Sequence, residues 1–226
     1  MKRKTSPSVG IREKAAAFAI TAIAAGTFLL FGQHSKIPVY VPAYEVIRVI
    51  DGDTFETKEK QLIRLSDVEA PELEYCGGTQ AKEKLEKLIL KKPVYLKVLY
   101  RDPYDRLISL VYTEKGSVNA MMLESGWAAF RSKDMHDTET LQKAVQKAKD
   151  KMIGIFSELC TQLENKEKPN CTIKGNNTMD KTTKYYHLKG CQTYAFTPVE
   201  LYVGDEWFCT ESEAQKAGYT KATQCP

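Results

Sequence analysis

Carboxylate side chains gather in two short segments of the sequence, and their spacing suits the binding of a cation. Asp51 and Asp53 lie two residues apart around a glycine, so in an extended turn both project to the same side. Glu69 and Glu72 follow in a bend that contains a proline. If the strands that carry these segments are neighbours, Asp53 and Glu69 meet, and a cation between them relieves their repulsion. Hard oxygen ligands of this kind favour calcium or magnesium.

Two arginines supply positive charge near these acids. Arg64 lies in an otherwise apolar stretch, where a charge needs a partner or a function. Arg106 lies between a turn and a stretch with strand character. A guanidinium presents a planar fork that matches a pair of phosphate oxygens, and it stays charged at any working pH. Acids, cation and arginines together suit the hydrolysis of a phosphodiester, in which a carboxylate takes the proton of the attacking water.

The elements that position these residues indicate a mainly β domain with helices, of the α+β class. β-branched and alternating stretches predict five strands, and apolar residues at helical spacing predict three helices. The predicted strands are residues 44–50, 54–57, 61–65, 93–100 and 107–112, and the predicted helices are residues 79–90, 117–125 and 139–156. Because the strands do not alternate regularly with helices, we expect an OB-like five-stranded barrel with three helices.

The N-terminal region predicts that the chain is attached to a membrane. Residues 1–14 form a basic tail whose excess charge equals the net charge of +4 of the whole chain. The remainder is neutral, so a phosphate-binding surface must be a local patch. An uncharged apolar run follows, and residues 15–32 are predicted as a transmembrane helix, with a cleaved signal as the alternative. The basic flank predicts a cytoplasmic tail, and a linker of residues 33–42 then leads to an extracytoplasmic domain.

Several blocks of the sequence, taken in order, resemble the staphylococcal nuclease family. They are residues 49–54, 64–72, 102–107, 118–119 and 125–128. The resemblance covers residues 43–158 and implies a calcium-dependent, low-specificity endonuclease that cleaves DNA and RNA outside the cytoplasm. The alternative is a non-catalytic OB-fold module that binds nucleic acid or a protein.

The resemblance assigns a metal site to the carboxylates. Asp53, Glu69 and the backbone carbonyl of Ala70 would ligate calcium, and Asp51 would lie behind these ligands. Two positions depart from the family pattern. Glu69 stands where Asp is usual, which moves the carboxylate outward by one methylene, and Ala70 stands where Thr is common.

The resemblance also assigns the catalytic side chains. Arg64 and Arg106 would clamp the phosphate and stabilise the transition state, Glu72 would act as the general base, and Tyr104 would contact the nucleotide. Asp105 replaces a common glycine beside Arg106, and its charge is expected to pull on that arginine.

The C-terminal part changes in composition. Residues 159–170 are predicted to be a polar linker, and residues 171–226 a small module rich in cysteine, too small for a secure core without disulfides or a metal. This module resembles an Ada-type metal-binding fold. The sequence predicts neither the role of this module nor the oligomeric state of the chain.

Two arrangements of its cysteines compete. In the first, zinc is held tetrahedrally by His187, Cys191, Cys209 and Cys225. In the second, the disulfides are Cys171–Cys209 and Cys191–Cys225, with Cys76–Cys160 as a third inside the nuclease-like domain. The predicted location outside the cytoplasm favours disulfides.

Overall fold

The computed structural model describes residues 43–131, 138–178 and 182–225. The predicted cytoplasmic tail, membrane anchor and first linker (residues 1–14, 15–32 and 33–42) lie outside the described residues. Within the described ranges, no helix has the length and apolar character needed to cross a bilayer.

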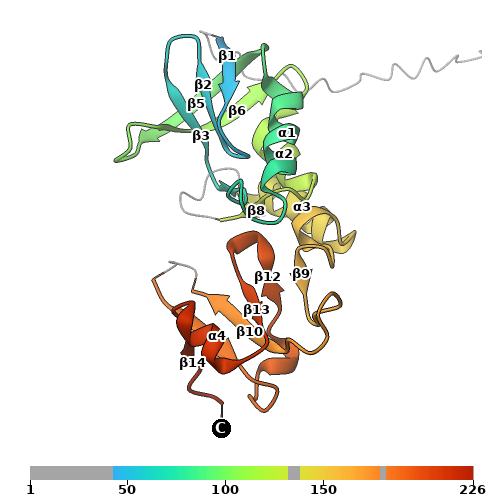
Figure 1. The fold of residues 1–226 in the computed structure, drawn as a ribbon. Helices are drawn as coiled ribbons and strands as arrows, with labels where there is room; N and C mark the ends of the chain where they lie inside the picture. Colours follow the sequence, from blue (N-terminus) through green and yellow to red (C-terminus); the bar gives the residue numbers. More distant parts are fainter. Residues whose placement is uncertain (1–42, 132–137, 179–181, 226) are drawn as a thin grey trace, which may run out of the picture. The chain divides into compact units, whose positions relative to one another are not determined.

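Five strands form a closed barrel, as predicted (Figure 1). They are β1 (Tyr44–Val49), β2 (Thr54–Thr57), β3 (Leu62–Leu65), β5 (Pro93–Arg101) and β6 (Leu107–Thr113). Hydrogen bonds join them in the order β3-β2-β1-β5-β6, and parallel pairing of β3 with β6 closes the barrel. The short β7 (Gly116–Ser117) extends β6. In this register Arg64 lies opposite Thr54 on one side and Ile108 on the other, which brings the predicted site segments together.

Three helices pack on the barrel, which fits an OB-like fold. α1 (Gly78–Ile89), α2 (Val118–Glu124) and α3 (Thr138–Asp150) each bury an apolar stripe in one common core. The two-residue strands β4 (Val68–Glu69) and β8 (Ala129–Phe130) pair beside them. This pairing fixes the segment that carries the predicted metal ligand Glu69.

The last predicted helix is wrong at its C-terminal end. We expected it to continue to residue 156, but α3 ends at Asp150 and a 3-10 helix, η1 (Gly154–Phe156), follows. Met152 and Gly154 both have positive φ, which the right-handed helix excludes. At Gly154 a Cβ would lie 2.0 Å from the carbonyl oxygen of Gly126, so only glycine allows this close contact. Met152, predicted on the buried face, is 58% exposed.

The C-terminal module contains a four-stranded sheet in the order β13-β10-β11-β14. Its strands are β10 (Ile173–Asn177), β11 (Lys184–His187), β13 (Glu206–Phe208) and β14 (Thr220–Lys221). α4 (Glu211–Lys216) begins with a capping box between Thr210 and Glu213. A small core of five buried residues joins sheet and helix, namely Ile173, Tyr186, Phe208, Ala214 and Tyr219.

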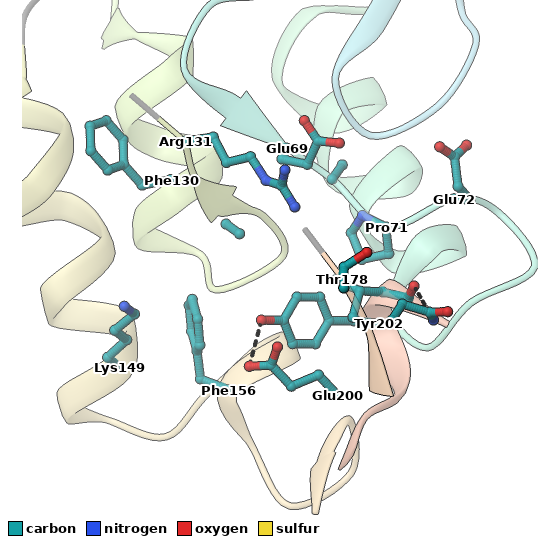
Figure 2. A pocket seen from close by; sticks show the side chains of 14 residues that line it. Glu69, Pro71, Glu72, Phe130, Arg131, Lys149, Phe156, Thr178, Glu200 and Tyr202 are labelled. Atoms are coloured by element: carbon teal, nitrogen blue, oxygen red, sulfur yellow. Dashed lines mark hydrogen bonds between the residues drawn. The ribbon is translucent and has the colours of Figure 1, made fainter. Parts of the chain in front are cut away.

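The module is attached to the segment that precedes it through backbone pairing. β9 (Thr161–Gln162), within the predicted linker of residues 159–170, pairs with β12 (Val199–Glu200) of the module. The backbone N–H of Leu201 donates to the carbonyl oxygen of Cys160 at 2.8 Å, and Trp207 Nε1 donates to Gln162 Oε1 at 2.8 Å. A cavity lies between the module and the segment that follows β4 (Figure 2).

All six cysteines are paired. The three disulfides are Cys76–Cys160, Cys171–Cys209 and Cys191–Cys225, the pairing of the disulfide alternative. The first joins residues 84 apart in sequence and ties the segment after the predicted metal ligands to the end of the nuclease-like domain. The other two staple the small module, whose core of five residues is otherwise modest.

Asn119 is a buried polar residue that joins three segments of the barrel. Its Oδ1 accepts from the backbone N–H of Val111 at 2.9 Å, and its Nδ2 donates to the carbonyl oxygen of Ser66 at 2.9 Å. The residue is fully buried. Since Ser66 lies between the predicted site residues Arg64 and Glu69, this amide fixes the turn that connects them.

We expect Asn119→Ala to lower the free energy of unfolding by about 2–4 kcal/mol, because it leaves the N–H of Val111 and the carbonyl of Ser66 buried without a partner. Urea denaturation of the oxidised chain measures the change, with Asn170→Ala, at an exposed asparagine, as the matched control. Equal stabilities of the two variants would contradict this role of Asn119.

Candidate active site

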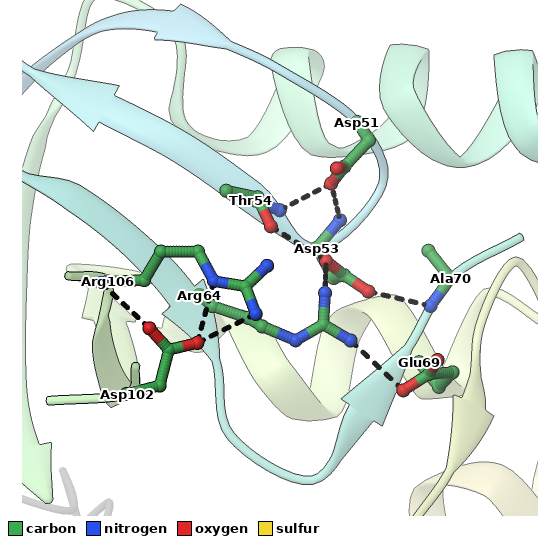
Figure 3. Close-up of polar contacts among 8 residues, drawn as sticks. All are labelled: Asp51, Asp53, Thr54, Arg64, Glu69, Ala70, Asp102 and Arg106. Carbon is green, nitrogen blue, oxygen red and sulfur yellow. Dashed lines mark hydrogen bonds and ion pairs between the residues drawn. The ribbon is translucent and has the colours of Figure 1, made fainter. Parts of the chain in front are cut away.

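Arg64 projects from β3 and binds two of the predicted metal ligands (Figure 3). Its Nη1 forms an ion pair with Oδ1 of Asp53, and its Nη2 forms one with Oε2 of Glu69 at 3.0 Å. Burial lowers the pKa of Arg64, but the attraction of Asp53 and then Glu69 outweighs burial, and the pKa is raised overall. Arg64 is therefore a fixed positive charge between two carboxylates.

Asp53 is a buried carboxylate with a dense set of donors. It is 3% exposed, its Oδ2 accepts from the backbone N–H of Ala70 at 3.0 Å, and its Oδ1 accepts from the hydroxyl of Thr54 at 2.9 Å. Burial raises the pKa of Asp53 to about 7, the charge of Asp51 adds to this rise, and Arg64 opposes it. Asp53 is therefore only partly ionised at neutral pH even beside Arg64, and a further positive charge at its free lone pairs would favour the ionised carboxylate.

Asp51 builds the turn that presents Asp53. Its Oδ1 accepts from the backbone N–H groups of Asp53 at 3.0 Å and of Thr54 at 2.7 Å. Between them, a Cβ on Gly52 would lie 2.5 Å from the Cβ of Ala70 and of Ala81 on α1. Glycine at this position therefore lets the turn pack directly on the segment that carries Glu69. Asp51 therefore shapes the turn from behind Asp53.

Arg106 is held by an acid that the sequence analysis did not single out. Asp102 Oδ2 accepts from Nε of Arg106 at 2.8 Å and pairs with its Nη2 at 2.7 Å (Figure 3). Oδ1 of the same carboxylate accepts from the backbone N–H groups of Tyr104 and Arg106. Partial desolvation raises the pKa of Asp102, but the hydrogen bonds from Arg106 outweigh it, so the pKa is lowered.

One cleft brings most of these side chains together. Arg64, Glu69, Asp102 and Arg106 line it, and Tyr104 lies at its edge with 77% of its surface exposed. The guanidinium carbon of Arg106 lies 5.4 Å from the centre of the Tyr104 ring. The two arginines therefore line one common space.

Glu72 lies apart from this lining. It is exposed, three residues beyond Glu69, and does not line the cleft between the arginines. It lines the cavity next to the C-terminal module, together with Glu69 and Ala70. Its charge is close enough to Arg64 to raise the pKa of that guanidinium. Glu72 thus lies at the margin of the site, within electrostatic range of its central arginine.

The donors present fit a hard divalent cation. Asp53 and Glu69 are both within reach of one guanidinium, so their oxygens are close together, while the Asp51 oxygen Oδ1 is used in its own turn. In the part of the chain that the structure describes, the acids form no cluster of three ligand groups. Two carboxylates and a backbone carbonyl, with water completing the shell, suit calcium or magnesium.

Residues 62–158 match the family model of staphylococcal nuclease homologues. An uncharacterised endonuclease of Escherichia coli O157:H7 is 30% identical over 117 residues, which cover 50% of this chain and 76% of that protein. The chain belongs to the staphylococcal nuclease family. A micrococcal nuclease of Shigella flexneri is 28% identical over 163 residues, which cover 64% of this chain and 89% of that protein. The match to an uncharacterised endonuclease of Haemophilus influenzae, 33% identical over 117 residues, covers 50% of this chain and 65% of that protein.

The structure shows the surroundings of two departures from the staphylococcal nuclease pattern. Asp105, at a position where the family commonly has glycine, has φ of 64°, a region that glycine favours and aspartate tolerates. The expectation that Asp105 pulls on Arg106 is wrong. Its carboxylate binds Arg101 at 2.8 Å, while Asp102 binds Arg106. Ala70, at a position where the family commonly has threonine, lies against Gly52.

The C-terminal module lies beyond the matched part of the family, which ends at residue 158. Of the residues predicted to bind zinc, His187, Cys191 and Cys225 lie within 4.8 Å of one another, but Cys209 is bonded to Cys171 instead. Cys191 and Cys225 are bonded to each other. The cysteines are therefore used as disulfides, and the tetrahedral zinc site is not formed.

Three contributors to the site were not recognised from the sequence. Asp102 was assigned only to a turn, although an acid four residues before an arginine is the spacing of the observed ion pair. Asn119 is uncharged, so the search for charged side chains did not predict its role. Arg131 follows β8, far from the site in sequence, and lines the cleft only because β8 pairs with β4.

We expect Asp102→Asn to lower the free energy of unfolding at pH 7 by about 1 kcal/mol, because the amide keeps the acceptors of the turn but loses the charge that holds Arg106. The folded pKa of Asp102 is lowered, so its contribution is present above the ordinary value and is lost as the pH falls through the folded value. Urea denaturation at pH 7 and pH 2.5 should show a smaller difference at pH 2.5. A difference of equal size at both would contradict the ion pair.

Proposed function

We propose that this protein is a calcium-dependent endonuclease that cleaves DNA and RNA with low sequence specificity. The observation that carries the proposal is the convergence of Arg64 and Arg106 on one cleft beside Asp53 and Glu69. Membership of the staphylococcal nuclease family supports it, as do the nuclease names of the relatives. The arginines match phosphate oxygens, which all nucleic acids share, so low specificity is expected.

Each side chain has a task in the proposed reaction. A calcium ion held by Asp53 and Glu69, with the carbonyl of Ala70, would supply Lewis-acid polarisation of a phosphoryl oxygen. Arg64 and Arg106 bind the phosphate and neutralise the charge that develops in the transition state. Glu72 takes the proton of the attacking water or orients that water.

Positioning by the fold supports these tasks. Asp102 holds the guanidinium of Arg106 in place, which reduces the reorganisation needed when phosphate binds. Tyr104, exposed at the edge of the cleft, presents its ring to a nucleotide. The neighbouring negative charges keep Arg64 protonated throughout.

We place the enzyme outside the cytoplasm, tethered through residues 15–32. Three disulfides support an oxidising compartment, since cytosolic proteins rarely keep such bonds. The apolar run and its basic flank support the tether.

The alternative is an OB-fold module that binds nucleic acid without cutting it. The observation that favours this alternative is that acids already bind both arginines, Arg64 through Asp53 and Glu69, and Arg106 through Asp102. In that case the same variants would change binding, and no cleavage would be found in any metal.

We expect the oxidised full-length chain to cut single-stranded DNA in calcium and to stop in chelator. Glu72→Gln and Arg106→Ala should each lower kcat by about 10²–10⁴-fold, because they remove the base and one phosphate-binding charge. Cleavage of a labelled oligonucleotide is measured in calcium, magnesium and chelator.

Matched controls are available in the same segments. Glu74→Gln changes an exposed acid two residues beyond Glu72, and Arg101→Ala changes an exposed arginine at the end of β5, five residues before Arg106. Both controls should keep nearly full activity. A folded parent that binds DNA but cuts none in any metal would establish the binding module instead.

A further inference from the structure

A second cavity adjoins the candidate active site, and the C-terminal module forms one of its walls. The segment with Glu69 and Glu72 lines one side, and Thr178, Glu200 and Tyr202 of the module line the other (Figure 2). Glu69 and Arg131 line both this cavity and the cleft between the two arginines. The two spaces are therefore neighbours that share these two side chains.

The wall formed by the module is held in place by several bonds. Asp205 is 4% exposed, and its carboxylate accepts from the backbone N–H groups of Asn177 at 2.8 Å and of Glu200 at 3.0 Å. This single acid joins the end of β10 to β12, the two module segments that line the cavity. Pairing of β12 with β9 and the Cys76–Cys160 disulfide then fix the module relative to the segment after Glu72.

The lining combines cations with aromatic rings. Arg131 points between Glu69 and the Tyr202 ring, and Lys149 and Phe156 lie on the side of the cavity away from Glu72 (Figure 2). Lys149 Nζ lies 5.5 Å from the centre of the Phe156 ring, and the Tyr202 hydroxyl is fixed by a 2.9 Å hydrogen bond to Glu200. Rings that accept a stacked base and cations that meet a phosphate are the combination by which proteins bind single-stranded nucleic acid.

We propose that this cavity is a nucleotide subsite, which takes the nucleotide next to the scissile phosphate and makes the C-terminal module part of the substrate-binding surface. The inference rests on the proposed nuclease function. A strand whose phosphate contacts Arg64 and Arg106 continues past Glu69, and the adjoining cavity is the space into which it leads. Arg131 and Lys149 face the neighbouring phosphate, and Tyr202 and Phe156 face the base.

The test compares two substrates of different length. For a 12-nucleotide single strand, Tyr202→Ala and Lys149→Ala should each raise KM about tenfold and leave kcat within about twofold. For the methyl ester of a mononucleotide, which lacks the flanking nucleotide, KM should not change. Lys149→Ala should also make binding of the 12-mer less sensitive to salt, because one phosphate contact is lost.

Matched controls are Tyr185→Ala, a half-exposed tyrosine of the module that does not line the cavity, and Lys143→Ala on the same helix as Lys149. Equal KM values for variants and controls, or equal changes for both substrates, would overturn the subsite. If the parent cuts neither substrate, the proposed function fails on its own. Fluorescence anisotropy of the labelled 12-mer then decides the subsite, which is overturned if the parent and Tyr202→Ala bind it equally.

Discussion

The guanidinium of Arg64 lies where the charges of four carboxylates converge, and the geometry of the site depends on this group. Asp53 and Glu69 bind it directly, while Asp51 and Glu72 act on it through space. Burial raises the pKa of Asp53, and the charge of Arg64 opposes this rise. A phosphate-binding arginine and a pair of metal-ligating acids therefore stabilise one another before any substrate or cation is present.

Strand pairing in the barrel places Arg64 close to Asp53 and Glu69. Antiparallel pairing of β2 with β3 puts the Asp53 turn beside it, and parallel pairing of β3 with β6 puts the strand after Arg106 on its other side. Gly52 allows the Asp53 turn to pack on Ala70 and α1, and Asn119 fixes the turn at Ser66. Gly52 and Asn119 therefore position the side chains of the site and contribute no reactive group of their own.

Much of this could be predicted from the sequence, for identifiable reasons. β-branched alternation predicted the strands of the barrel, and apolar periodicity predicted its helices, mostly within a few residues of their observed ends. Arg64 was predicted to be a functional residue because a charge in an apolar strand needs a partner. The end of α3 was missed because apolar periodicity continues through residue 155. The positive φ of Met152 and the close approach of Gly154 to Gly126 are not visible in that periodicity. Asp102 and Arg131 were missed because their roles arise from a side-chain pair and a strand pair that local patterns do not reveal.

The pairing of the cysteines could not be predicted from local sequence patterns either. Spacing alone left zinc and disulfides as alternatives, because His187 and Cys191 have ligand spacing and the partner of each cysteine depends on the tertiary fold. The pairing of Cys76 with Cys160 ties the chain just after Glu72 to the residue that precedes β9. It also explains how a small module can be held firmly beside the site.

The most direct test of the account is calorimetric titration of the oxidised chain with calcium in the absence of substrate. The acids around Arg64 should bind one calcium ion per chain, and Glu69→Gln should weaken binding at least about tenfold while the exposed Glu74→Gln does not. Calcium that binds the parent and Glu69→Gln equally, or that does not bind at all, would contradict the assignment of these carboxylates to a metal site.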